Sequence, residues 1–408
     1  MSPTDPSAAA RFAGTVRFPT ISLPGRFSLD PFHAMREYAC SQWPGVFSTM
    51  ELEVLGGASI LLRWQGLDDG SQALLLTAHQ DVVPPGEGNW SFDPFCGRIM
   101  EGRVLGRGTI DYKCGFAGML EACESLIGSG FTPSRTVYLA FGHDEEVGGF
   151  AGAGAITANL LEKGARCSSV LDEGGYVYPF GNGSEKAVVA VAEKGYATFR
   201  ITSRAVQGHS STPPAETAIG TLARALCILD DLGIHYPSLP PELRDMDFAG
   251  TTIAPTVIKG GCRENVLPAC AEALVNTRPA PLSSVAEVQR QISGALEGLA
   301  VRVELVDDPS VSEPSRLSST DTEDFKSIRS AIADVLGPVP VVPGIFPAAT
   351  DSRRYGKVAD QTYRFLPVRL GPRGIGELHS VDESISVKDY LNCVRFYAQY
   401  ITRAASNC

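Results

Sequence analysis

Residues 136–149 read TVYLAFGHDEEVGG, and this stretch is the key to the rest of the sequence. A mostly apolar run leads into His143, Asp144, Glu145 and Glu146, and two glycines close the stretch. A short apolar run bounded by turn residues is typical of a buried strand. Three consecutive acids at the end of such a strand repel one another unless cations or protons compensate. Because apolar residues flank the acids, a solvated charge run is disfavoured and a cation site at a strand end is predicted.

Three further apolar runs surround this stretch, namely SILLRW (59–64), ALLLTAHQD (73–81) and SSVLDEG (168–174). Helical stretches separate them, one beginning near Gly115 and another between residues 149 and 168. Strands that alternate with helices predict an α/β fold, with a mostly parallel sheet covered by helices on both faces. Ligands of such sheets bind beyond the carboxyl ends of the strands, where the His and acidic residues of this sequence fall.

Between residues 195 and 307 the pattern changes to strand, helix, two strands, helix and strand. This order is typical of a split βαβ unit of the ferredoxin type. Each helix carries one apolar stripe, and we expect both stripes to face the core. The stripes are Ile219, Leu222, Ala223, Leu226 and Leu229 in the first helix, and Val285, Val288, Ile292, Leu296 and Leu299 in the second.

The chain of 408 residues exceeds the usual size of a single hydrophobic core, so two domains are expected. Helix and strand segments resume after residue 309, and a long amphipathic helix over 386–405 ends the chain. We expect this helix to return to the first sheet. The prediction is therefore a discontinuous catalytic domain of residues 1–194 and 308–408, with residues 195–307 inserted into it.

The formal net charge of -11 disfavours nucleic-acid binding, because no basic stripe offsets it, and small molecules are the expected partners. The ten cysteines include no CxxC pair, so reduced thiols are expected. The N-terminus lacks the layout of a signal peptide, and no run approaches the roughly 18 apolar residues of a membrane span. We therefore expect a cytoplasmic protein with no membrane association.

Histidines and carboxylates near the strand ends form a candidate metal site. His79 ends one apolar run, and Asp81 is placed to hold the ring nitrogen that binds no metal. Asp111 stands in a Gly-flanked turn, and His379 stands in a Gly-rich loop before the last helix. Together with Glu146 and one further acid, these residues supply two imidazoles and three carboxylates, a set suited to zinc, cobalt or manganese.

The further acid is Asp172 or Glu173, because a regular strand points only one of two adjacent side chains into the site. The sequence leaves this choice open, and it leaves the native metal open too. One shared carboxylate could hold two ions about 3.5 Å apart. Glu145 remains as a spare carboxylate and is the candidate general base for the attacking water.

Six motifs, in this order along the chain, resemble the aminoacylase and carboxypeptidase S family of co-catalytic zinc peptidases. They are HxD (79–81), GxxD (108–111), HDEE (143–146), LDEGG (171–175), GHSSTPP (208–214) and ELHSVDE (377–383). The resemblance spans nearly the whole chain and extends to glutamate carboxypeptidase and succinyl-diaminopimelate desuccinylase. AEKGY (192–196) and GHSSTPPAETAIG (208–220) place the most similar subgroup among carboxypeptidase S and the N-acyl amino acid synthase/hydrolases.

The resemblance implies a zinc-peptidase fold with two zinc ions bridged by Asp111. Glu146 and His379 would complete one ion, and His79 with the acid at 172 or 173 would complete the other. Glu145 is implied to be the base, and Asp81 the partner of His79.

The resemblance also makes the inserted domain a dimerisation or lid domain of a homodimer. His209 would reach across the dimer and stabilise the oxyanion of the tetrahedral intermediate. Asn265 and Arg278 would grip the carboxylate and carbonyl oxygens of the substrate. Arginine suits this role because its planar fork pairs with both oxygens of a carboxylate.

The expected reaction is therefore metal-dependent hydrolysis of an amide bond next to a free carboxylate, in an N-acyl amino acid. The alternative within this family is a dipeptidase or a carboxypeptidase. The alternative outside enzymes is an inactive metal-bound scaffold, which would require a missing ligand or base. The acyl group and the preferred amino acid stay open.

Overall fold

A computed structural model describes residues 6–25, 28–180, 184–234, 239–244, 249–371 and 374–406. The chain forms two units. The first comprises residues 1–191, 318–343 and 350–408, and the second comprises residues 192–317 and 344–349.

Three short segments that we expected in the catalytic domain, 192–194, 308–317 and 344–349, belong to the second unit. Backbone hydrogen bonds explain this placement. Tyr196 and Ser312 exchange two bonds of 2.9 Å, and the N–H of Lys194 donates to the carbonyl of Phe346 at 3.0 Å.

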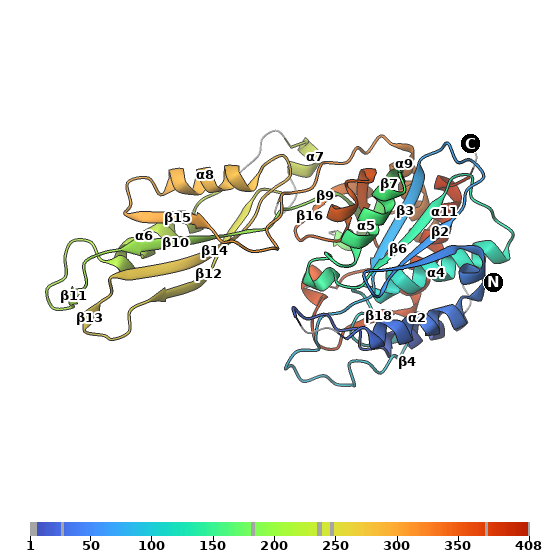
Figure 1. Cartoon of the computed structure of the whole chain (residues 1–408), viewed down its shortest axis with the longest axis horizontal. Coiled ribbons are helices and arrows are strands. Elements are labelled where there is room, and N and C mark those ends of the chain that lie inside the picture. The colour runs from blue at the N-terminus through green and yellow to red at the C-terminus, as the bar shows by residue number, and fades with distance from the viewer. Residues whose placement is uncertain are drawn as a thin grey trace. The chain divides into compact units, whose positions relative to one another are not determined.

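The first unit contains a mixed sheet, nine-stranded among the described residues, with the order β1-β2-β6-β3-β7-β17-β9-β16 and with β8 paired to β9 (Figure 1). The four adjacent strands β6, β3, β7 and β17 are parallel, which confirms the predicted α/β class. The strands are β1 (Glu51–Leu55), β2 (Ser59–Trp64), β3 (Ala73–His79), β6 (Val137–Gly142), β7 (Cys167–Asp172), β8 (Val177–Phe180), β9 (Ser184–Glu193), β16 (Val341–Phe346) and β17 (Ala359–Arg364).

One strand departs from the predicted parallel alternation. β2 runs antiparallel to β6, with Leu62 opposite Leu139. The cause is the connection between β2 and β3, which consists of residues 65–72 and contains no helix. Parallel strands need a crossover of about a dozen or more residues, so β2 runs opposite to β3 and therefore opposite to β6, which is parallel to β3. An apolar run carries no information about strand direction, and the strand-helix alternation that implies parallel pairing begins only at β3.

Helices cover both faces of this sheet (Figure 1). Leu75 of β3 belongs to one buried cluster with Ile156 of α5 and Tyr355 of α10. On the other face α4 packs against β3, and α11 packs against α4 and α9. The helices of this unit are α1 (Pro6–Val16), α2 (Asp30–Gln42), α3 (Pro44–Thr49), α4 (Lys113–Gly128), α5 (Ala153–Glu162), α9 (Glu323–Leu336), α10 (Ser352–Tyr355) and α11 (Val387–Ala404), with 3₁₀ turns η1 (Glu145–Val147) and η2 (Gly374–Glu377).

A small antiparallel sheet, β18-β5-β4, brings two distant loops side by side. It consists of β4 (Arg98–Met100), β5 (Arg103–Leu105) and β18 (Ser384–Ser386), with Ser384 opposite Leu105. The loop that follows β5 contains Asp111, and the loop that precedes β18 contains His379. Pairing of β5 with β18 therefore places these two loops next to each other.

The second unit has an antiparallel sheet of order β12-β14-β10-β15. Its elements are β10 (Ala197–Arg204), α6 (Ala218–Asp230), α7 (Pro241–Arg244), β12 (Thr252–Gly260), β14 (Cys270–Arg278), α8 (Val285–Ala295) and β15 (Val301–Leu305), with the short pair β11 (Gly208–His209) and β13 (Val266–Leu267). Chain order and strand order agree with the predicted ferredoxin-type unit.

The core of the second unit confirms the stripe of α8 and corrects that of α6. Val288 and Ile292 of α8 are fully buried. In α6 the buried residues are Ala218, Thr221, Leu222, Ala225 and Leu229, so Leu222 and Leu229 of the predicted stripe are confirmed. Ile219 is 44% exposed, so the apolar face lies one position away from the predicted stripe.

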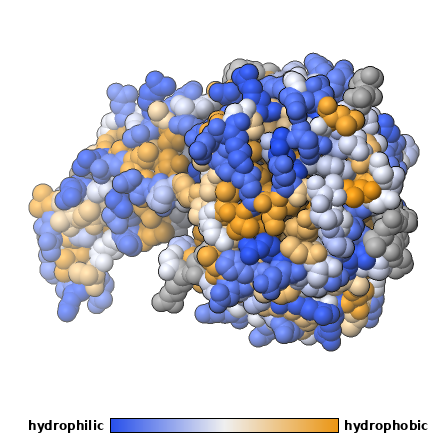
Figure 2. Space-filling model, turned by 45° about the vertical axis from the view of Figure 1, so that its right-hand side comes forward, coloured by the Kyte–Doolittle hydropathy of each residue, from blue (hydrophilic) through white to orange (hydrophobic). Residues whose placement is uncertain are grey.

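Hydrophobic residues also reach the surface of both units (Figure 2). They include Phe150 and Met100 in the first unit and Val206 and Ile258 in the second. No helix in the described ranges combines the length and the apolar content needed to cross a membrane.

Candidate metal centre

The carboxyl ends of three parallel strands bring the predicted residues to one edge of the sheet. β3 ends at His79, β7 ends at Asp172, and η1 begins three residues after the end of β6. His79 lies opposite Gly142 of β6, so the acids of η1 follow directly beside the imidazole. This arrangement is the expected place for a ligand site in an α/β sheet.

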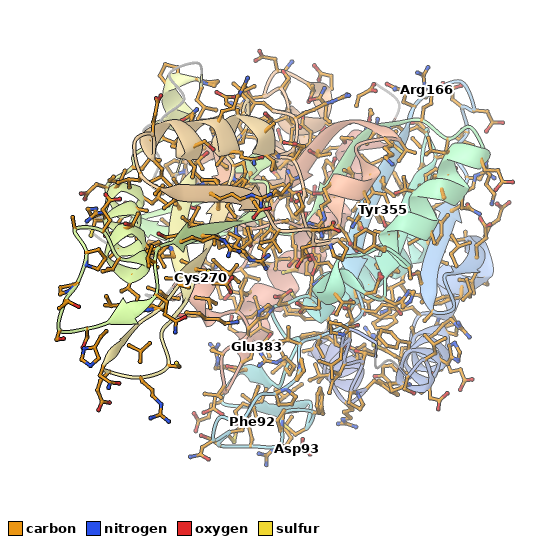
Figure 3. The ribbon with its side chains drawn as sticks, turned by 60° about the vertical axis from the view of Figure 1, so that its left-hand side comes forward. Phe92, Asp93, Arg166, Cys270, Tyr355 and Glu383 are labelled. Carbon is orange, nitrogen blue, oxygen red and sulfur yellow. The ribbon has the colours of Figure 1, made fainter. Side chains whose placement is uncertain are left out.

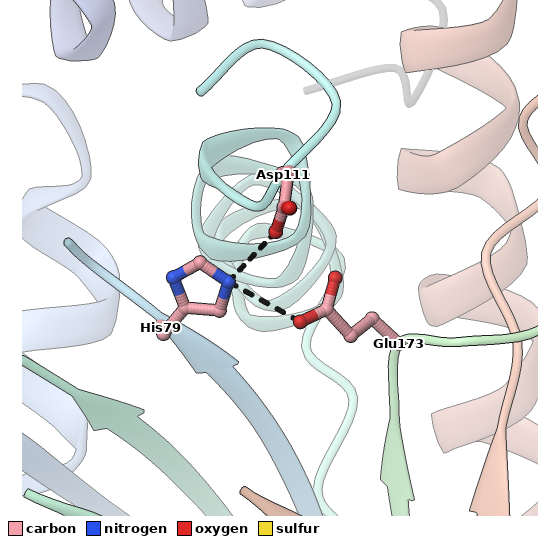
Figure 4. Close-up of side chains that lie close together, drawn as sticks. All are labelled: His79, Asp111 and Glu173. Atoms are coloured by element: carbon pink, nitrogen blue, oxygen red, sulfur yellow. Dashed lines mark hydrogen bonds and ion pairs between the residues drawn. The ribbon is translucent and has the colours of Figure 1, made fainter. Parts of the chain in front are cut away.

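The first ligand group consists of His79, Asp111 and Glu173, all buried (Figure 4). The Nε2 atom of His79 lies 2.9 Å from Oδ1 of Asp111 and 3.2 Å from Oε1 of Glu173. One ligand atom from each residue lies within 4.8 Å of the other two. These three residues therefore present one nitrogen and two oxygens to a common point.

The second group consists of Asp111, Glu146 and His379. The Nε2 atom of His379 lies 2.9 Å from Oδ2 of Asp111 and 3.3 Å from Oε2 of Glu146. Asp111 thus directs one carboxylate oxygen toward each imidazole. This is the arrangement that a carboxylate shared by two ions requires.

The donor set of both groups fits divalent metal ions. Ligands about 2.0 to 2.1 Å from a tetrahedral zinc ion are roughly 3.3 Å apart, and the four ligand-to-ligand distances above run from 2.9 to 3.3 Å. Oε1 of Glu146 is buried and has no hydrogen-bond partner among the described residues. A buried anionic oxygen without a donor is costly, and a cation would compensate it.

Asp81 links the histidine of the first group to the acids of η1. The Nδ1 atom of His79 lies 2.9 Å from the carbonyl oxygen of Asp81 and 3.4 Å from its carboxylate. The Asp81 carboxylate accepts the backbone N–H groups of Glu145 and Glu146, each at 3.1 Å. Because Nδ1 faces an acceptor, the ring proton is held there and Nε2 is left for a metal. The predicted partner of Nδ1 was the Asp81 carboxylate, but the backbone carbonyl of Asp81 lies closer to Nδ1.

The electrostatics of the centre favour added positive charge. Burial disfavours a charged imidazole at His79, yet Glu173, Asp111 and Asp81 raise its pKa well above the usual value. Hydrogen bonds to Asp111 and Glu146 raise the pKa of His379 to about 10. Burial opposes ionisation of Asp111, but its bonds to both imidazoles hold its pKa below the usual range. Without a metal, the carboxylates thus stabilise a proton on the Nε2 atoms of His79 and His379, which are the atoms that would bind a metal.

Of Asp172 and Glu173, only Glu173 belongs to the first ligand group. Asp172 Oδ1 accepts the N–H of Glu173 at 2.8 Å, and Oδ2 accepts the N–H of Ser352 at 2.8 Å. The Asp172 carboxylate therefore holds the start of α10, and it belongs to neither ligand group among the described residues. The chain leaves the strand at this point, which is why alternation alone could not make the choice.

Glu145 lies beside the ligand groups with its carboxylate in neither of them. Burial raises the pKa of Glu145 well above its usual range, and so do Asp351, Glu146 and Glu173, while the charge of His79 opposes this rise. A carboxylate with a raised pKa is a stronger base once ionised. This property suits the predicted role in proton transfer.

Sequence reasoning did not identify Asp351, which lies next to the centre. Asp351 is 2% exposed, and its two carboxylate oxygens have no hydrogen-bond partner among the described residues. Burial and the neighbouring Asp172 raise its pKa well above the usual value. The apolar strand β16 precedes this acid, so the pattern that identified His79 and Glu146 was present here as well.

The three residues predicted to contact substrate lie in the second unit, in two separate places. His209 in β11 is paired with Val266, and the N–H of Ser210 donates to the carbonyl of Asn265. Arg278 ends β14, opposite Thr252, and its guanidinium lies 4.8 Å from the ring centre of Tyr196. The structure thus brings His209 and Asn265 together and leaves Arg278 at the other end of the sheet.

Several known proteins resemble this chain over most of its length. It is 33% identical to the N-fatty-acyl-amino acid synthase/hydrolase PM20D1.1 of Danio rerio, over 95% of this chain and 84% of that protein. It is 30% identical to the probable carboxypeptidase S-like 2 of Dictyostelium discoideum, over 98% of this chain and 85% of that protein.

Solved structures share the fold at lower identity. An M20 family metallo-carboxypeptidase from Sulfolobus solfataricus superposes with a TM-score of 0.72 at 17% identity, covering 97% of this chain and 99% of that one. A dinuclear metal binding peptidase from Bacillus subtilis superposes with a TM-score of 0.65 at 14% identity, covering 98% and 99%. A sequence model of peptidase family M20/M25/M40 matches residues 75–403. The motifs, the α/β sheet with its ligand groups and this match together show that the chain belongs to peptidase family M20/M25/M40.

Proposed function

We propose that this chain is a metal-dependent amidohydrolase that cleaves N-acyl amino acids at the amide bond next to the free carboxylate. The observation that carries the proposal is the pair of ligand groups that share Asp111, with the basic carboxylate of Glu145 beside them. The similarity to the N-fatty-acyl-amino acid synthase/hydrolase of Danio rerio supports the choice of substrate class.

Five residues would hold two divalent ions, for which zinc is our first choice because the donors are imidazoles and carboxylates. They are His79, Asp111, Glu146, Glu173 and His379. When bound, the ions would polarise the scissile carbonyl and make a water molecule more acidic. Asp111 would hold both ions, and Asp81 would orient His79.

Glu145 is the proton carrier of the proposed reaction. It would accept a proton from the attacking water and then deliver that proton to the leaving nitrogen. The water oxygen bonds to the carbonyl carbon, the C–N bond breaks, and the acyl part leaves as a carboxylate while the nitrogen leaves as the amine. Because the proton that Glu145 takes from water is the one the amine needs, a single carboxylate can serve both transfers. Substitution of Glu145 should therefore stop turnover without emptying the ligand groups.

His209 is the proposed oxyanion donor. Its Nδ1 atom lies 3.1 Å from the donating N–H of Ser211 and 2.8 Å from the Ser211 hydroxyl. Because Nδ1 accepts this N–H, the proton of the neutral ring resides on Nε2. An Nε2–H group is the donor that a developing oxyanion requires.

We further propose that His209 serves the active site of a second copy of the chain. β14 separates the His209–Asn265 region from Arg278 by the length of the strand, eight steps from Cys270 to Arg278. At about 3.3 Å per residue this length is roughly 26 Å. The oxyanion and the carboxylate of an N-acyl amino acid are only a few bonds apart, so one chain cannot offer both contacts to the same substrate molecule.

The edge strand β12 is the proposed dimer contact. Among the described residues β12 has one partner strand, β14, and its residues from 254 to 260 are exposed. Ile258 is 63% exposed and Val257 is 40% exposed, and Ile219 of α6 lies 3.3 Å from the position that a side chain on Gly260 would take. An exposed strand edge with apolar neighbours favours pairing with another strand. Ile258→Lys should turn a dimer into a monomer in light scattering with size exclusion.

A mixing experiment tests whether His209 acts across this dimer. Glu145→Gln and His209→Asn should each be inactive as homodimers. In a mixed dimer one site carries both changes and the other carries neither. Random reassortment makes about half of the dimers mixed, so activity should return to roughly a quarter of wild type. Verified subunit exchange without recovery would assign His209 to its own chain or to a structural role.

A dipeptidase or a carboxypeptidase is the second candidate, since the similar protein of Dictyostelium discoideum bears the name carboxypeptidase S-like. The test is a panel of N-acyl amino acids, dipeptides and the corresponding C-terminal amides, assayed after reconstitution with zinc. The proposal expects the highest kcat/KM on N-acyl amino acids. Preference for dipeptides would replace it with the second candidate. Bound metal without turnover on any substrate would indicate an inactive scaffold.

A reducing, cytoplasmic location is the remaining proposal. Each of the nine cysteines within the described ranges is a free thiol. Subcellular fractionation with an antibody to the native protein would test it.

A further inference from the structure

A buried carboxylate supports the loop that presents Asp111. Glu383 is 3% exposed and lies between His379 and β18. Its Oε2 accepts the N–H of Gly108 at 2.9 Å, and its Oε1 accepts those of Ile110 at 2.8 Å and Asp111 at 3.3 Å. A single side chain (labelled in Figure 3) therefore binds three backbone N–H groups of this loop.

A buried guanidinium joins this loop to the loop of His379. Arg107 is 1% exposed, and its Nη1 donates to Oε2 of Glu383 at 2.7 Å. Nη1 also donates to the carbonyl of Ser380 at 3.2 Å, and Nη2 donates to the carbonyl of His379 at 3.1 Å. Trp90 covers the guanidinium, with 5.1 Å between Cζ and the ring centre.

The loop of His379 needs such support. His379 has a φ of 62° and Asp382 a φ of 56°, so two non-glycine residues adopt the left-handed region. Such residues persist only where surrounding contacts hold them. Arg107 holds the carbonyl of His379 itself, and the Asp382 carboxylate accepts the N–H and the hydroxyl of Ser91, both at 2.8 Å.

We infer that Arg107 and Glu383 are positioning residues of the metal centre: as one buried ion pair they hold Asp111 and His379 at the separation that binds metal. Neither residue contacts a ligand atom of the centre, and both act through the backbone of a ligand. The inference rests on the proposed ligand roles of Asp111 and His379.

The two members of the pair should have different effects on the two metal positions. Glu383 supports Asp111, which both groups share, so Glu383→Gln should weaken both. Arg107 contacts the carbonyl of His379, which belongs to one group. Arg107→Lys keeps the charge but lacks the planar fork that reaches two carbonyls and a carboxylate together. It should therefore weaken chiefly the group that contains His379.

The experiment is a zinc titration of the full chain against a chromophoric chelator at fixed pH. Changes in residues that orient metal ligands typically cost about 10- to 100-fold in affinity. Glu383→Gln should lose this much for both ions, and Arg107→Lys should lose it for one ion while the other stays within about twofold. A purely structural role would not produce this asymmetry. Glu383→Asp, which keeps the charge but is one methylene shorter, serves in the same way if Glu383→Gln does not fold.

The matched control is Glu121→Gln. Glu121 is 1% exposed, pairs with Arg11 at 2.6 Å and accepts the indole N–H of Trp43 at 2.8 Å, yet it contacts neither ligand loop. Its zinc affinities should equal those of wild type. If the Glu383 and Arg107 variants also bind two zinc ions with wild-type affinity, or if the control loses as much as they do, the positioning role is overturned and the proposed function stands. Wild-type protein that takes up no zinc would overturn the proposed function itself.

Discussion

Replacement of Asp81 by asparagine tests how the first histidine and the acids of η1 are held. Asp81 is fully buried, and its two carboxylate oxygens accept the N–H groups of Glu145 and Glu146, each at 3.1 Å. Asparagine keeps one oxygen and presents an NH2 group in place of the other. One of the two N–H groups therefore loses its acceptor and faces a donor.

The magnitude follows from these contacts. A hydrogen bond to a charged group contributes about 1.5 to 3 kcal/mol to stability. Because Asp81 is fully buried, solvent does not weaken its two bonds. At about 1.4 kcal/mol per factor of ten, the change corresponds to roughly a 10- to 150-fold loss. We expect this loss in zinc affinity, because the N–H group that is released belongs to the segment carrying the proposed ligand Glu146.

The assay is competition for zinc with a chromophoric chelator, followed by kcat measurements at saturating zinc. Asp144→Asn is the matched control. Asp144 also accepts two backbone N–H groups, from Ala151 and Gly152 at 2.7 Å each, and it is 6% exposed. It should lose similar stability in chemical denaturation and retain zinc affinity within about threefold of wild type.

Two results would refute this reasoning. Unchanged zinc affinity and kcat in Asp81→Asn would show that the contacts with η1 do not set the ligand geometry. An equal loss of affinity in Asp144→Asn would show that general loosening of the strand end, and not the link through Asp81, is responsible.

Three further variants and one pH dependence test Glu145, Arg278, His379 and Lys194. Glu145→Gln should lower kcat by about 100- to 10,000-fold, while elemental analysis still finds two ions per chain; near-normal turnover would remove this residue from proton transfer. Arg278→Ala should lower kcat/KM for N-acyl amino acids by roughly 10- to 150-fold and hardly affect their C-terminal amides, whereas equal losses would indicate a structural role. Zinc affinity should rise with pH by up to about tenfold per unit, since His379, whose pKa is raised to about 10, holds a proton that the metal must displace; an affinity independent of pH below that value would contradict this. Burial, and to a smaller extent the charge of Arg278, lowers the pKa of Lys194 from 10.5 to about 8, so the unfolded chain binds the proton more tightly than the folded chain. Between about pH 8 and 10.5 the unfolding free energy of wild type, measured by urea titration, should therefore rise relative to that of Lys194→Met by at most about 1.4 kcal/mol per pH unit. Parallel pH profiles of the two proteins would show that burial does not disfavour the charged form of Lys194.

Part of the centre could be predicted because it depends on local pattern. His79 and Glu146 follow apolar runs, and the carboxyl ends of parallel strands meet at one edge of a sheet. A few consecutive residues determine where a strand ends, so the sequence was sufficient to predict that these side chains lie together. The same holds for the ferredoxin-type order of the second unit, whose helices and strands differ in period.

Local pattern was insufficient where the backbone leaves regular structure. The choice of Glu173 over Asp172 depends on the N–H of Ser352, 180 residues away, which takes the Asp172 carboxylate. The antiparallel direction of β2 depends on the short connection of residues 65–72 to β3 and on which strand β2 pairs with, since an apolar run reads the same in both directions.

The sequence by itself thus determined the fold class, the family motifs and the strand ends at which ligands gather. Only the tertiary structure decided that Asp111 faces two imidazoles, that Glu383 and Arg107 join loops more than 270 residues apart, and that β14 separates Arg278 from His209. The physical reason is range. Strand and helix periods come from neighbouring residues, whereas the direction of a buried carboxylate is set by the backbone N–H groups and cations that folding brings to it from distant parts of the chain.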